Sequence, residues 1–108
     1  MISRRGARLT AEDLPALREF ARAYLHEDVM AEYGSAVAAA SAYLADASPA
    51  EASHLASDLD RLRRAAVRWS AARLATFFTR QLRAAWVPET VDDLERLSAS
   101  AHRGAPPA

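Results

Sequence analysis

Residues 48 to 69 read SPAEASHLASDLDRLRRAAVRW and carry the clearest folding signal in the chain. Ser48 at the N-cap, Pro49 at the first helical position and Glu51 at the third together form a capping box, which starts a helix. Apolar residues then recur at alternating spacings of three and four, the pattern of antiparallel helices packed side by side. These residues are Ala52, Leu55, Leu59, Leu62, Ala66 and Trp69. The stretch therefore predicts a helix over residues 49–68.

A helix is also predicted upstream, over residues 13–26. Its apolar residues recur at helical spacing, and Pro15 is tolerated because a proline fits the first turn of a helix. Thr10 and Asp13 are both of a type that caps the start of such a helix.

A single glycine separates this helix from the next one. Gly34 is the only glycine between residues 6 and 104, so it marks a junction where the chain turns. Ser35 follows it as an N-cap, and apolar residues continue at helical spacing. We therefore predict a helix over residues 35–47.

The second half of the chain continues the helical pattern. Residues 70–86 carry an apolar stripe whose phase is shifted near Trp69, which we interpret as a separate helix after a short break. One long bent helix from Pro49 to Trp86 remains an alternative, since no Gly or Pro separates the two stripes. Pro88 stops the run, and a last helix is predicted over residues 90–102.

These five helices predict an all-α fold, arranged as a compact bundle. With 108 residues, the chain has the length of one domain, which we expect over residues 10–103. A flexible arm is expected over residues 1–9 and a disordered tail over residues 104–108. No window approaches the roughly 18 apolar residues of a membrane span, and no Cys occurs. We therefore expect a cytoplasmic protein.

Charge is distributed unevenly along the chain. Residues 11–60 hold ten acids and two Arg, whereas residues 61–85 hold seven Arg and no acid. Guanidinium groups on one helix face neutralise phosphates, so the Arg61–Arg83 face suggests an alternative function as a small helical nucleic-acid-binding regulator. The zero net charge and the lack of aromatic residues on that face argue against nucleic acid as the partner.

Three titratable residues in a row, His26, Glu27 and Asp28, raise the question of an active site. The zinc-protease motif needs a second His at position 30, where Met30 stands. Glu51 and His54 match the Glu-x-x-His element of di-iron bundles, but those proteins use the element twice. A metal-dependent enzyme using His26, Asp28 and His54 is therefore a third and weaker hypothesis. We predict no enzyme, no catalytic residue, no metal and no cofactor.

The same region also suits protein recognition. Glu27, Asp28 and Glu32 lie beside Tyr33, a mixture of acids and an aromatic ring that suits contact with a basic partner. We therefore take these four residues as the candidate partner-binding residues.

Residues 14 to 62, LPALREFARAYLHEDVMAEYGSAVAAASAYLADASPAEASHLASDLDRL, resemble the small helical CdiI-type immunity proteins of bacterial contact-dependent growth inhibition. The pattern of that family reads approximately L-P-x-L-R-x-F-x-x-x-Y-x-H-Q-D-W-x-x-x-Y-G-S, followed by a helix, S-P-E-E and another Leu-rich helix. Residues 74 to 97 resemble the closing segment of the family more loosely. Glu27 replaces the usual Gln, Val29 the usual Trp, and Arg83 a Gly that often follows the Leu. The matching residues include Tyr24, His26, Asp28, Tyr33, Gly34, Ser35, Ser48 and Pro49.

This resemblance implies a cytoplasmic immunity protein without enzymatic turnover. Such a protein would bind the C-terminal toxin domain of a cognate effector and block its active or substrate-binding site. Many toxins of this kind are nucleases with basic clefts, and the acidic half of the chain fits such a partner. The oligomeric state and the identity of the toxin are left open by the sequence.

Overall fold

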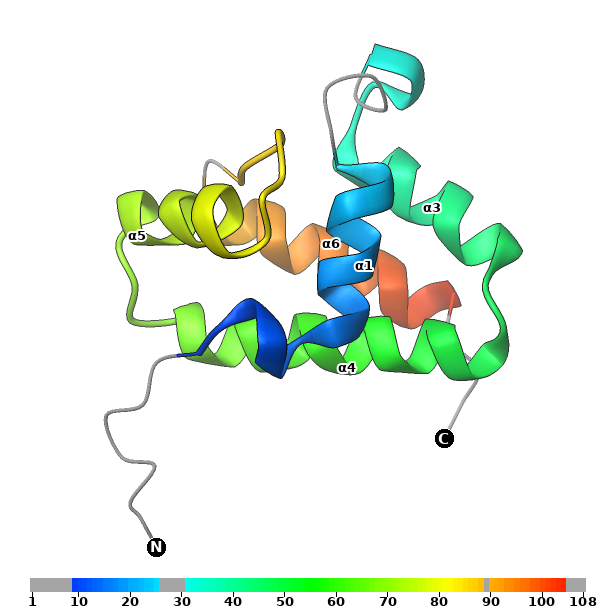
Figure 1. The fold of residues 1–108 in the computed structure, drawn as a ribbon, viewed down its shortest axis with the longest axis horizontal. Coiled ribbons are helices and arrows are strands. Elements are labelled where there is room, and N and C mark those ends of the chain that lie inside the picture. Colours follow the sequence, from blue (N-terminus) through cyan, green and yellow to red (C-terminus); the bar gives the residue numbers. More distant parts are fainter. Residues whose placement is uncertain (1–8, 26–30, 89, 105–108) are drawn as a thin grey trace, which may run out of the picture.

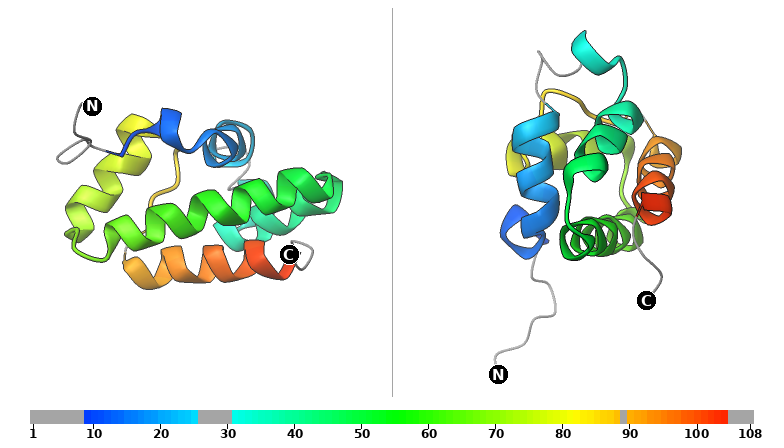
Figure 2. Two further views of the ribbon diagram at one scale, coloured as in Figure 1. Left: turned by 90° about the horizontal axis from the view of Figure 1, so that it is seen from below. Right: turned by 90° about the vertical axis from the view of Figure 1, so that its right-hand side faces the viewer.

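The computed structural model describes residues 9–25, 31–88 and 90–104, and it confirms the all-α fold (Figure 1). Helix α4, Pro49–Ala66, and helix α6, Val91–Gly104, lie side by side and run in opposite directions (Figures 1 and 2).

Two further helices pack on this pair. Helix α3, Ala36–Asp46, contacts α6, and helix α1, Pro15–Tyr24, crosses α4 and contacts α3. The right-hand view of Figure 2 shows α1 and α6 on opposite sides of α3 and α4. Helix α1 is therefore an outer helix, and the apolar sides of α3 and α4 lie between it and α6.

Shorter helical turns complete the described part of the chain. A 3₁₀ turn, η1, covers Ala11–Asp13, and residues 31–33 are also helical. Helix α5, Ala71–Thr76, continues directly into the π-helix η2, Phe77–Gln81. The side chains that make up the core come from all of these helices. The largest fully buried ones are Phe20, Phe78, Leu14, Leu17, Leu25, Leu55, Leu59, Leu62, Leu74, Leu82, Leu94 and Leu97.

The predicted caps are confirmed where they depend on neighbouring residues. Ser48 Oγ accepts the Glu51 N–H at 3.1 Å, and Glu51 Oε1 accepts the Ser48 N–H at 2.8 Å. Ser35 Oγ accepts the Ala38 N–H at 3.0 Å, directly after Gly34, whose φ is +83°. These local signals therefore start α3 and α4 at the predicted places.

The question of one bent helix or two is also answered. Helix α4 ends at Ala66, and Ser70 caps α5 by accepting the Arg73 N–H at 3.1 Å. The two apolar stripes therefore belong to two helices.

Two predicted helix ends are wrong. The helix predicted over 13–26 begins only at Pro15, because the residue before a proline is disfavoured in the α conformation, and Leu14 has φ −131° and ψ 62°. The helix predicted over 70–86 is no longer helical beyond η2. Arg83 has a φ of +55°, in the left-handed region, and it turns the chain away at this point.

The predicted arm and tail lie outside the described residues, with one exception at each end. Leu9 is half-buried and packs against the core, so the folded part begins before residue 10. Gly104 is the last residue of α6 rather than the first of a tail.

Asp58 of α4 caps helix α1 from a distance of more than forty residues in the sequence. Its Oδ2 accepts the N–H of Ala16 at 2.8 Å and the N–H of Leu17 at 3.1 Å. Leu14, at the N-cap position, has no side-chain acceptor, and the carboxylate of Asp13 instead accepts the Thr10 N–H at 2.9 Å. The free N–H groups at the start of α1 therefore depend on a buried carboxylate of another helix.

We predict that Asp58→Ala lowers the free energy of unfolding by about 2 kcal/mol, because it leaves two N–H groups without their charged acceptor. Asp58→Asn keeps an acceptor oxygen but loses the charge, so its loss should be smaller. Urea denaturation measures both. Ser57→Ala, at the exposed neighbouring position, is the control. Equal stability of Asp58→Ala and this control would show that the cap is unimportant.

We also predict that Arg83→Gly stabilises the protein. A residue with a β-carbon in the left-handed region costs about 1–2 kcal/mol, and glycine avoids this cost but has more conformational freedom in the unfolded chain. A net gain of about 0.5–1 kcal/mol is expected, seen as a higher Tm. Arg83→Ala retains the backbone strain and should show no such gain. If the alanine variant gained as much as the glycine variant, the strain at this position would be disproved.

Candidate functional site

The structure places two of the four candidate partner-binding residues. Glu32 is exposed, and Tyr33 is half-buried with its ring stacked on Tyr24 at 6.4 Å between centroids. Glu27 and Asp28 lie outside the described residues, as does His26.

Tyr33 is one end of a row of aromatic rings that crosses from residues 31–33 to α1 and α3. Tyr24 meets Tyr43 edge-on at 5.5 Å, and Phe20 meets Tyr43 at 5.4 Å. Burial raises the pKa of the Tyr33 hydroxyl, and the negative charge of Glu32 raises it further. Burial likewise raises the pKa of the Tyr43 hydroxyl, followed by the charges of Glu51 and Glu19. Tyr33 and Tyr43 therefore lie close to negative charge.

A groove of about 720 Å³ lies beside Tyr43, between α1, α3 and α4. We call it the acidic groove, because four acids and one arginine line it. Its lining residues are Asp13, Pro15, Ala16, Glu19, Ala23, Tyr43, Glu51, His54, Ser57, Asp58 and Arg61.

Three of its four carboxylates are held in place by hydrogen bonds to backbone N–H groups. Asp58 binds the start of α1, Glu51 binds the start of α4, and Asp13 binds the Thr10 N–H. Arg61, the one positive residue, donates to the backbone oxygen of Asp13 at 2.8 Å. Glu19 is different, because its side chain is 71% exposed and pairs only loosely with Arg22 at 3.6 Å. The groove therefore combines fixed negative groups with one exposed carboxylate.

The chemistry of this groove suits a cationic side chain. The carboxylates attract an ammonium or guanidinium group, and Tyr43 offers a ring on which such a group can stack. Pro15 and Ala16 supply apolar surface for the methylene part of a Lys or Arg side chain.

Of the three residues of the metal hypothesis, the structure describes only His54. Glu51 and His54 line the same groove, but within residues 9–25, 31–88 and 90–104 no three metal-binding side chains form a group. His26 and Asp28 lie outside those ranges.

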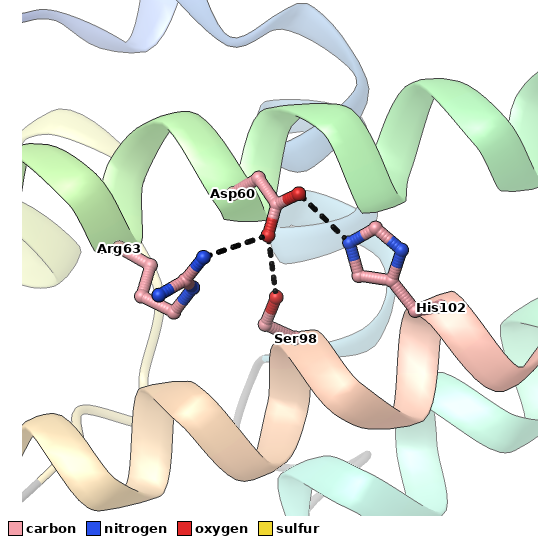
Figure 3. Close-up of polar contacts among 4 residues, drawn as sticks. All are labelled: Asp60, Arg63, Ser98 and His102. Atoms are coloured by element: carbon pink, nitrogen blue, oxygen red, sulfur yellow. Dashed lines mark hydrogen bonds and ion pairs between the residues drawn. The ribbon is translucent and has the colours of Figure 1, made fainter.

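A Ser, a His and an Asp do meet between α4 and α6 (Figure 3). Asp60 accepts a hydrogen bond from Ser98 Oγ at 3.2 Å and lies 2.9 Å from His102 Nε2. In a catalytic triad the serine must donate to the histidine, whereas here both side chains bind the carboxylate. Arg63 adds an ion pair to Asp60 at 3.5 Å. The cluster therefore joins two helices and lacks the geometry of an activated nucleophile.

The charge state of Asp60 follows from these neighbours. Partial burial raises its pKa, but the charge and hydrogen bond of His102, the hydrogen bond of Ser98 and the charge of Arg63 together lower it below the ordinary value of 3.8. The carboxylate form is thus favoured in the folded chain.

The arginines of the predicted basic face make different contacts. Arg61 holds the backbone of Asp13, Arg63 pairs with Asp60, and Arg73 stacks over Trp69 with 4.5 Å between its guanidinium carbon and the ring centroid. Arg64 on α4 and Arg68 in the turn that follows α4 are exposed. The Arg61–Arg83 set is therefore divided among several contacts, and the division disfavours the nucleic-acid alternative.

Comparison with protein families identifies the class. Residues 13–77, more than half of the chain, match the family model of the CdiI immunity protein. The chain belongs to this family of toxin-neutralising immunity proteins, as its resemblance over residues 14 to 62 predicted. No curated protein and no solved structure matched the chain. None of the described helices has the length and apolar character needed to cross a membrane.

None of the residues that line the groove was among the predicted site residues. Glu19, Tyr43 and Asp58 matter most among those that were missed. A signal for Asp58 is present, since it lies three residues after Leu55 and four before Leu62, on the apolar side of its helix. An acid at such a position needs a buried partner. Glu19 and Tyr43 have no comparable signal, because only the packing of α1 against α3 and α4 brings them together.

The low pKa of Asp60 predicts a pH dependence of stability. Such a carboxyl stabilises the fold above the unfolded-state pKa, near 4, and this contribution is lost as the pH falls through the folded-state pKa. Asp60→Asn should therefore cost about 1 kcal/mol at pH 6, with the difference from the unaltered protein shrinking toward pH 3. Urea denaturation at several pH values measures this. Glu95→Gln, an exposed carboxyl on α6, is the control and should show no such trend.

Proposed function

We propose that this immunity protein binds the C-terminal toxin domain of a cognate contact-dependent growth inhibition effector and occludes its active or substrate-binding site. The observation that carries the proposal is the acidic groove, with Tyr24, Tyr33 and Tyr43 at its side. Membership of the immunity protein family supports the toxin as the partner. The protein acts in the cytoplasm and by binding alone, without turnover.

The charge of the groove indicates what it binds on the toxin. Negative groups in a groove attract a partner with exposed Lys and Arg side chains, and they speed its association. A nuclease carries such side chains where it binds the phosphates of its substrate. A toxin held by these groups cannot bind its nucleic acid at the same time, which explains inhibition by steric and electrostatic occlusion.

The candidate residues Glu27, Asp28, Glu32 and Tyr33 extend the same proposal. Glu32 raises the pKa of Tyr33, and Tyr33 stacks on Tyr24, so these residues continue the negative and aromatic surface away from the groove. Glu27 and Asp28 would add two more acids near them in sequence.

Co-expression tests the proposal. The chain should restore growth to cells that produce the toxin domain encoded beside it, and the two proteins should copurify. Glu19→Arg should weaken this complex, because Glu19 is the exposed acid of the groove and lacks a capping role. The triple variant Glu27→Ala, Asp28→Ala, Glu32→Ala should chiefly slow association and reduce its dependence on salt.

Stopped-flow or surface-plasmon measurements give these rates. Glu95→Arg, at an exposed position of α6, is the matched control for Glu19→Arg. Loss of affinity in both would mean that net charge alone matters and not the groove. Failure of the unaltered chain either to rescue growth or to form a complex would refute the proposed function.

A further inference from the structure

A second pocket, of about 490 Å³, lies on the other flank of α1, between this helix and η2. We call it the arginine pocket, because Arg18, Arg22, Arg80 and Arg83 line it together with a single acid, Glu12. Arg18 and Arg22 are one turn apart on α1 and therefore lie on the same side of that helix. Four positive groups against one negative group give the pocket an excess of three charges.

Most of this charge has no neutralising partner among the described residues. Arg22 pairs with Glu19, but at 3.6 Å and with both side chains largely exposed, so the pair is weak. Within the part of the chain that the structure describes, Arg18, Arg80 and Arg83 form no ion pair. The arginine pocket therefore presents guanidinium groups that remain available to an outside anion.

The backbone at Arg83 is a second and independent observation. Its φ of +55° is the only positive value at a non-glycine position in the described residues, and Arg83 lies two residues after the end of the π-helix η2. Both features are uncommon and are enriched at functional sites. Glycine would satisfy this turn without strain, so the position retains a guanidinium group at a cost in stability.

The two pockets share α1 as their common wall. Pro15, Glu19 and Ala23 line the acidic groove, whereas Arg18 and Arg22 line the arginine pocket. A long polyanion, such as duplex nucleic acid, would reach from the arginines to the acids and be repelled there. A folded partner with separate acidic and basic patches meets both sides favourably.

We propose that the arginine pocket receives an acidic segment, rich in Asp and Glu, of the same toxin domain whose basic surface enters the acidic groove. The toxin would then dock astride α1. This inference rests on the proposed function and adds a second contact of opposite charge to it. Two patches of opposite sign define one orientation of the partner and exclude toxins that lack either patch.

Calorimetry tests this inference. It measures how tightly the full chain binds the toxin domain encoded by the adjacent gene, prepared in a catalytically inactive form. Charge reversal in the double variant Arg18→Glu, Arg80→Glu should weaken binding about tenfold or more. The matched control, Arg64→Glu with Arg68→Glu, makes the same change of net charge at two exposed positions, one near the end of α4 and one in the turn after it. It should leave the affinity within about twofold of the unaltered chain.

Variants of Arg83 distinguish an effect on binding from an effect on folding. Arg83→Gly should raise the Tm and yet weaken toxin binding several-fold, because it removes strain and a contact together. Arg83→Ala should weaken binding to the same extent without raising the Tm. Unchanged affinity in both variants would remove Arg83 from the contact surface and contradict the inference.

The remaining outcomes are distinct from one another. Equal weakening by the pocket variant and by the Arg64 and Arg68 control would overturn the arginine pocket as a contact, while the proposed function would stand. A short DNA duplex retained by the unaltered chain at low salt, and released by the Arg18 and Arg80 reversal with toxin affinity unchanged, would assign the pocket to phosphate instead. If the unaltered chain bound no toxin at all, both proposals would fall together.

Discussion

Helix α1 is held at both ends by residues that are far away in the sequence, and this constraint positions the rest of the surface. At its start, Asp58 of α4 accepts the Ala16 and Leu17 N–H groups at 2.8 and 3.1 Å. At its end, the Leu25 carbonyl accepts the N–H of Ala85 at 2.7 Å. A helix of ten residues is marginal by itself. Its stability therefore comes from these two contacts and from its buried apolar side.

This arrangement links the fold to both proposed contact surfaces. The turn at Arg83 directs the backbone toward Leu25, so the strained residue that lines the arginine pocket also helps to place the end of α1. On the opposite flank, Asp58 supplies the cap and also part of the negative field of the acidic groove. A change at either residue thus alters stability and binding surface together, whereas Glu19 and Arg18 are exposed and affect the surface alone.

Interactions between residues close together in the sequence were predicted, whereas interactions between distant residues were not. Ser35 and Ser48 cap their helices through neighbours three residues away, so α3 and α4 were predicted nearly to the residue. Asp58 acts across 42 residues, and no local pattern reveals its partner. The end of η2 was missed because Arg83 adopts a conformation that sequence reasoning assigns to glycine. Glu32, the one candidate acid that the structure describes, is not among the residues that line the acidic groove, because the groove arises only from the packing of α1 against α3 and α4.

Most of the groove carboxylates are held in place before any partner binds, and this affects how the groove recognises a partner. Asp13, Glu51 and Asp58 are already held by backbone N–H groups, so a partner that binds them does not have to order them. Free surface acids would each lose side-chain entropy on binding, which reduces the gain from an ion pair. The same hydrogen bonds compete for the carboxylate lone pairs, so these three acids act mainly through their field. Close contact with a toxin cation then falls to the exposed carboxylate of Glu19, and the fixed acids determine where that cation arrives.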